Sequence, residues 1–139
     1  MSDERFAPPE SELESYDRGA SPALWNPDAA GVWSILFTPV FGSYLLLKNC
    51  QAIGDVDKIQ AGRLWLGISV VMLIVSAMLP LVGLGYIILW YFLWQAKQTA
   101  IIRARWGANY QRRSWAAPLA IALGLSLCFG LINLLLRSP

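Results

Sequence analysis

The chain has no histidine, only two cysteines and few charged side chains. Among its 139 residues, 14% are charged, against about 25% in an ordinary globular protein. The lack of histidine removes the commonest metal ligand and the usual proton carrier near neutral pH. Cys50 and Cys128 are expected at different depths of the fold, which makes them poor disulfide partners. Since no nucleophile with a base, carboxylate pair or phosphate-binding loop is evident, we expect no enzyme, no metal and no cofactor.

Long apolar runs take the place of charge. The longest extends from Leu64 to Ala96 without a charged side chain, and shorter runs cover Ala29 to Leu47 and Trp115 to Leu136. A helix of roughly 20 apolar residues crosses the hydrocarbon core of a bilayer, which is about 30 Å thick. The runs therefore predict an all-α integral membrane protein.

Residues 1–24 have a different composition, rich in Pro, Ser, Glu and Asp. Such a segment buries too little apolar surface to offset the entropy of ordering it. We expect a flexible acidic tail over 1–24 and a transmembrane helical domain over 25–139. The domain is expected to begin at Asn26, Pro27 and Asp28, because these residue types favour the first turn of a helix.

Proline and glycine positions suggest how the domain is divided. Pro39 breaks the first apolar run, and Pro80, followed by Gly83 and Gly85, breaks the central one. We therefore predict a bundle of four transmembrane helices, at about 27–48, 61–79, 84–103 and 115–136. The first helix is kinked at Pro39 or is broken and partly re-entrant. The alternative is three spans with a kinked central helix.

Basic residues gather at the end of the third predicted helix and in the loop before the fourth. The group consists of Lys97, Arg103, Arg105, Arg112 and Arg113. The positive-inside rule places such a loop in the cytoplasm, which under the four-helix interpretation leaves both termini outside. The same residues are a candidate patch for anionic lipid head groups, although basic loops also serve topology alone.

The last predicted helix carries a line of small or polar residues at helical spacing, called here the small face. Its members are Pro118, Ala122, Ser126, Gly130 and Asn133. Small residues let two helix backbones approach closely in a membrane, and Asn133 could hydrogen-bond across the contact. The face is a candidate surface for packing against another helix, either within the chain or in a partner.

The run from Asn26 to Gly42 contains the pattern N-P-x-A-A-x-x-W-S-x-x-F-x-P-x-F-G. With Trp90-Tyr91-Phe92 and the segment from Tyr110 to Trp115, it resembles a group of small, uncharacterised bacterial membrane proteins. The resemblance implies a bacterial inner-membrane location. It assigns no functional residues.

These features predict a non-catalytic, multi-pass inner-membrane protein that acts through lateral contacts with protein or lipid. The expected partners are membrane lipids and a membrane protein or further copies of the chain, and nucleic acid is not expected. One alternative is an immunity-type protein that neutralises a pore-forming toxin within the membrane. Another is a small oligomeric channel or transporter, although no ionisable residue lies inside the apolar runs.

Overall fold

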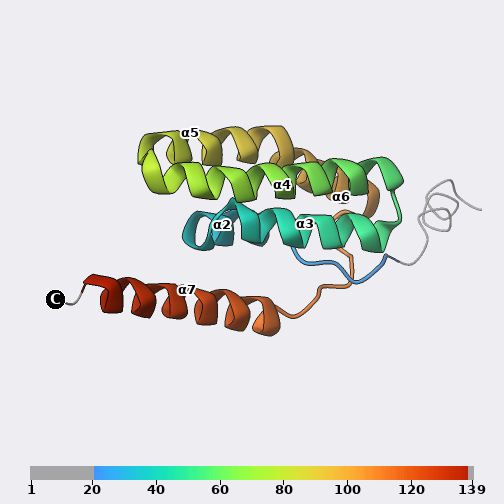
Figure 1. The fold of residues 1–139 in the computed structure, drawn as a ribbon. Helices are drawn as coiled ribbons and strands as arrows, with labels where there is room; N and C mark the ends of the chain where they lie inside the picture. Colours follow the sequence, from blue (N-terminus) through green and yellow to red (C-terminus); the bar gives the residue numbers. More distant parts are fainter. Residues whose placement is uncertain (1–20, 138–139) are drawn as a thin grey trace, which may run out of the picture.

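The computed structural model describes residues 21–137, and its secondary structure is helical, with no strand in that part of the chain (Figure 1). The predicted tail up to residue 20 lies outside the described residues. Leu24, also assigned to the tail, is fully buried. In chain order the elements are α2 (Pro27–Phe37), α3 (Pro39–Ile53), α4 (Val56–Met78), α5 (Pro80–Trp90), the π-helix η2 (Tyr91–Gln95), α6 (Ala96–Trp106) and α7 (Ala116–Arg137).

The predicted helix over 27–48 is broken at Pro39, which was one of its two expected forms, and the first apolar run folds back on itself as a helical hairpin. Thr38 has a φ of 103° and separates α2 from α3, which begins at Pro39. The Asn49 side chain accepts a hydrogen bond from the Trp25 N–H at 2.9 Å and donates one to the Trp25 carbonyl at 2.8 Å. In one continuous helix, residues 24 positions apart would be separated by about 36 Å. The chain therefore reverses at Thr38 and returns to the end where α2 begins.

The two arms of this hairpin pack closely at Gly42. A Cβ at that position would lie 1.9 Å from the Ser34 hydroxyl oxygen and 2.7 Å from the Trp90 ring. Ser34 itself donates to the Ala30 carbonyl at 2.6 Å. Only glycine fits between α2 and the Trp90 ring, so residue 42 sets how near the arms approach.

A second hairpin is formed by α4 and the nearly continuous helix α5, η2 and α6. It turns at Leu79, and Gly83 on α5 lies against Ser76 on α4, where a Cβ would approach the hydroxyl oxygen to 2.5 Å. Trp65 and Trp94 stack further from the turn at Leu79, with ring centroids 6.1 Å apart. Both arms are longer than the predicted spans 61–79 and 84–103. The helix of the first arm already begins at Val56, and that of the second arm runs from Pro80 to Trp106.

A hydrogen-bonded chain of side chains joins the two hairpins in the buried interior. The Trp90 indole donates to Ser43 at 2.8 Å, the Ser43 and Ser69 hydroxyls are 3.0 Å apart, and Ser69 reaches the Tyr86 hydroxyl at 2.7 Å. The Gln95 amide, on η2, donates to the Pro27 carbonyl. These bonds satisfy polar groups away from water and fix the first hairpin against the second.

Helix α7 lies apart from both hairpins (Figure 1). The loop before it is tied to the start of the described chain, because the Leu24 N–H donates to the Gln111 carbonyl at 2.9 Å and the Arg113 N–H donates to the Leu24 carbonyl at 2.8 Å. Most of the large apolar side chains of α7 are exposed.

One end of the molecule collects the start of α2, the end of α3, the start of α4, the end of α6 and the start of α7 (Figure 1). We call it the basic end. Its basic residues are Lys48, Lys58, Arg103, Arg105, Arg112 and Arg113. If each of the four predicted helices crossed the membrane once, residue 25 and the loop between α6 and α7 would lie at opposite ends of the molecule. Trp25 instead contacts Arg113 and Ser114 of that loop, because the α2–α3 hairpin ends on the side where it begins.

Among the described helices, α4 is long and apolar enough to cross a membrane, by length and composition. In α7 the apolar stretch from Ala116 to Ile132 is shorter than that criterion requires. The fold is thus all-α, and one helix is suited to crossing a bilayer.

Candidate functional site: a basic pocket at the start of α2

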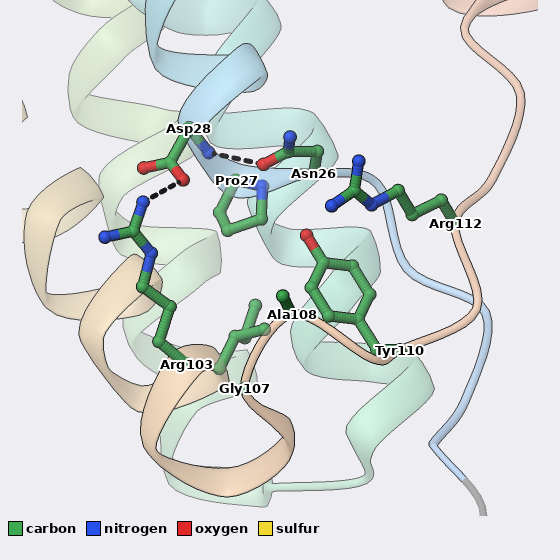
Figure 2. A pocket seen from close by; sticks show the side chains of 9 residues that line it. Asn26, Pro27, Asp28, Arg103, Gly107, Ala108, Tyr110 and Arg112 are labelled. Carbon is green, nitrogen blue, oxygen red and sulfur yellow. Dashed lines mark hydrogen bonds and ion pairs between the residues drawn. The ribbon is translucent and has the colours of Figure 1, made fainter.

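A pocket of about 300 Å³ opens at the basic end, between the first turn of α2, the last turn of α6 and the loop that follows α6. Figure 2 shows its side chains, which come from segments some 75 residues apart in the sequence. Its lining consists of Asn26, Pro27, Asp28, Ile102, Arg103, Gly107, Ala108, Tyr110 and Arg112.

The local sequence explains why α2 begins and α6 ends at this pocket. The Asn26 side chain accepts a hydrogen bond from the Asp28 N–H at 3.1 Å, and Pro27 occupies the first turn of α2. The helix dipole gives this end of α2 a partial positive charge. Gly107, with a φ of 63°, ends α6 and turns the chain along the pocket wall; a side chain at that φ would be strained.

Arg103 and Asp28 form an ion pair across the pocket, with 2.6 Å between Nη2 of the arginine and Oδ2 of the aspartate. Both side chains are substantially exposed, at 66% and 48%. A pair in that setting contributes about 1 kcal/mol at most. Its main effect is positional, because it holds the Arg103 guanidinium at the edge of the pocket.

Arg112 and Tyr110 form the opposite wall. The Arg112 guanidinium lies 5.7 Å from the centroid of the Tyr110 ring, and no carboxylate of the described residues pairs with it. Burial raises the pKa of Tyr110, an effect that the nearby Arg112 charge partly opposes. The Tyr110 hydroxyl is therefore a hydrogen-bond donor at neutral pH. In Figure 2 this hydroxyl and the Arg112 guanidinium both point toward Asn26.

Two members of the predicted lipid patch line the pocket, and the other three lie outside its lining. Arg103 and Arg112 line it. Arg105 lies over the Trp106 ring at 4.9 Å and Arg113 over the Trp25 ring at 4.6 Å. Lys97 is exposed in the first turn of α6, away from the pocket lining.

Sequence reasoning missed Asn26, Asp28 and Tyr110 as pocket residues. Asn26 and Asp28 are recognisable as helix-start residues, and Tyr110 precedes the basic pair of the loop. Neither signal indicates that the two segments meet, since that contact depends on the α2–α3 hairpin returning to the basic end.

The small face of α7 is placed outside this pocket. Ala122 is buried, Pro118 is half-buried, and the Ser126 hydroxyl donates to the Ala122 carbonyl of its own helix at 2.9 Å. A Cβ at Gly130 would meet open space. The Asn133 side chain lies outside the described side chains. A packing role for this face stays a prediction.

The side chains that line the pocket are of the types that bind anions in proteins. Two guanidinium groups and one carboxylate line it, and the Tyr110 hydroxyl adds a hydrogen-bond donor. Within residues 21–137, no cluster of three or more His, Cys, Asp or Glu side chains could hold a metal ion. The chain matches no family model, no curated protein and no solved structure.

Proposed function

We propose that this chain is a non-catalytic, multi-pass protein of the bacterial inner membrane that acts through lateral contacts with lipid and with other membrane helices. The observation that carries the proposal is the exposed apolar surface of α4, α5 and α7, which in water would far exceed the patches tolerated on a soluble monomer. Lipid tails or the helices of another protein would cover that surface.

The arrangement supports three crossings and one half-crossing. At 1.5 Å per residue α4 is about 35 Å long and α7 about 33 Å, enough for a hydrocarbon core of about 30 Å. The helix from Pro80 to Trp106 is longer still. The α2 arm is about 16 Å long, so the first hairpin enters one leaflet and leaves on the same side. The positive-inside rule puts the basic end in the cytoplasm.

Helix α7 is the element best suited to contact another membrane protein or a second copy of the chain. It has no charged residue from Ala116 to Leu136, most of its large apolar side chains are exposed, and Gly130 has open space beside it. Close packing of helices in lipid relies on such small residues.

Cross-linking from a single cysteine would test this contact in native membranes. Starting from a Cys50→Ala, Cys128→Ala chain, Ser126→Cys places a thiol on the small face. The matched control restores Cys128, which is exposed and lies about 200° around the helix from residue 126. We expect a short cross-linker with one thiol-reactive end and one photoreactive end to join Ser126→Cys into an adduct, either a dimer or a complex with another membrane protein, much more efficiently than Cys128.

Gly130→Leu should reduce the Ser126→Cys adduct, because a leucine fills the space that a neighbouring backbone would use. Gly124→Leu is the control, since residue 124 also faces open space but lies on the other side of α7. Equal cross-linking at both cysteine positions, or equal effects of both leucines, would contradict the proposed small-face contact. The adduct's mass separates self-association from a partner, such as a toxin held by an immunity protein.

A further inference from the structure

We propose that the basic pocket and the exposed apolar stripe of α2 together form a binding site for one anionic phospholipid. Its phosphate would lie between Arg103 and Arg112, and an acyl chain would follow α2 away from the basic end. The inference rests on the proposed function, because it requires α2 to lie in one leaflet of a membrane.

Charge and geometry at the pocket favour a phosphate. Arg103 is held in place by Asp28 at 2.6 Å, while Arg112 has no carboxylate partner among the described residues and projects toward the same cavity (Figure 2). Guanidinium groups bind phosphate oxygens through paired N–H donors. Two arginines against one aspartate leave a surplus positive charge, and the Tyr110 hydroxyl lines the same space.

An apolar stripe leads from this pocket along α2. Asp28, Val32, Ile35 and Leu36 occupy positions i, i+4, i+7 and i+8, which lie on one face of a helix. The three apolar members are 63%, 67% and 70% exposed. The face is therefore continuous with the pocket at Asp28 and is left open by the rest of the chain.

The stripe ends at a second hollow. A groove of about 260 Å³ lies where α2 meets the tip of the second hairpin, and its lining includes Ile35, Leu36, Met72, Leu73, Pro80 and Leu84. The hollow exists because α2 ends at Phe37 whereas α4 and α5 continue beyond it (Figure 1).

The lengths also agree with one lipid in one leaflet. The 11 residues of α2 span about 16 Å, close to half of a hydrocarbon core of about 30 Å. A free phosphate would use the arginines and leave the stripe and groove without a role. The continuous path from Asp28 to Leu36 therefore favours a phospholipid over a soluble anion.

Native mass spectrometry of the full-length protein in mild detergent would test the site. We expect phosphatidylglycerol to be retained about tenfold more strongly than phosphatidylcholine with the same acyl chains, since charge-assisted hydrogen bonds favour the net anion. Arg112→Gln should reduce retention of phosphatidylglycerol about tenfold. Arg105→Gln, in the same basic region but stacked on Trp106, should leave it nearly unchanged. Equal retention of the two lipids, or equal effects of the two variants, would overturn the proposal.

A second pair of variants tests the apolar stripe. Val32→Gln places an amide between the pocket and the groove, and Ile74→Gln places one on α4 at a similarly exposed position, 65% against 63%. Only Val32→Gln should weaken phosphatidylglycerol retention, by several-fold. Inorganic phosphate and glycerol phosphate serve as competitors at millimolar concentration. If either competitor displaces bound phosphatidylglycerol as effectively as added phosphatidylglycerol does, the site binds a soluble anion and the lipid assignment is wrong.

The outcome is separable from that of the proposed function. Gly130→Leu alters α7 and should retain phosphatidylglycerol normally even where it abolishes cross-linking. Loss of lipid selectivity with intact small-face cross-linking would remove the lipid site alone. Selective lipid retention without cross-linking would remove the α7 contact alone.

Discussion

Asn49 on α3 holds both backbone groups of Trp25, accepting from its N–H at 2.9 Å and donating to its carbonyl at 2.8 Å. The two residues are 24 positions apart, and their contact closes the α2–α3 hairpin at the basic end. Asn49 is itself 2% exposed. One buried side chain thus replaces the water that these two backbone groups would otherwise bind.

Asn49→Ala should destabilise the fold by about 1 to 3 kcal/mol, because it leaves two partly buried backbone groups without partners. The measurement is the free energy of unfolding of the detergent-solubilised protein in a denaturant titration. Asn109→Ala serves as the control, since the Asn109 side chain is exposed in the loop after α6. Equal stability of the two variants would show that the Trp25 bonds contribute little.

Gly42→Ala should also destabilise the protein, by about 1 to 3 kcal/mol, because the added Cβ overlaps the Ser34 hydroxyl and the Trp90 ring. Gly67→Ala is the matched control within α4, where a Cβ meets open space. Alanine there should be neutral or stabilising by up to about 1 kcal/mol. Ser34→Ala combined with Gly42→Ala should recover part of the loss, since the 1.9 Å contact disappears while the one with Trp90 remains. Similar unfolding curves for the two glycine variants would contradict the close approach.

Asp55 should make the fold sensitive to acid. It caps α4 by accepting from the Lys58 N–H at 3.1 Å, and its bonds to Lys58 hold its pKa below the usual 3.8. A carboxyl with a lowered pKa in the folded state stabilises the fold above its unfolded pKa, and this contribution is lost as pH falls through the folded value. Asp55→Ala should thus lower the melting temperature at pH 7, and the difference from the parent chain should shrink below about pH 4.

Asp57→Ala is the comparison for this acid sensitivity, because Asp57 lies in the same turn but does not cap the helix. It should change the melting temperature less than Asp55→Ala at pH 7. A constant gap between the parent chain and Asp55→Ala from pH 7 to pH 3 would exclude Asp55 as the group responsible.

Thiol labelling should place Ser21 and Asn109 on one side of the membrane. In a chain lacking Cys50 and Cys128, Ser21→Cys and Asn109→Cys should both react with an impermeant maleimide from the cytoplasmic face, because the α2–α3 hairpin adds no crossing between them. The assay compares inverted with right-side-out vesicles. Labelling of the two positions from opposite faces would restore the four-span arrangement and contradict the hairpin.

The sequence by itself determined that the fold consists of apolar helices and where those helices break. Uncharged runs such as Leu64 to Ala96 predict buried or lipid-facing helices, because unpaired backbone groups are costly away from water. Asn26-Pro27 marks a helix start, and Pro39 and Pro80 mark breaks, since proline lacks an N–H and fits the first turn of a helix. The helices α2, α3 and α5 begin at these three prolines.

Tertiary structure decided the direction that the chain takes after each break. Proline at residue 39 permits either a kink or a reversal, and the reversal depends on two contacts between the arms, Gly42 against Ser34 and Asn49 with Trp25. The same reversal brings Asp28 to Arg103 and forms the basic pocket. Local residue preferences specify where a helix ends, but the contacts that orient the next helix join residues far apart in the chain, which only the packed structure brings together.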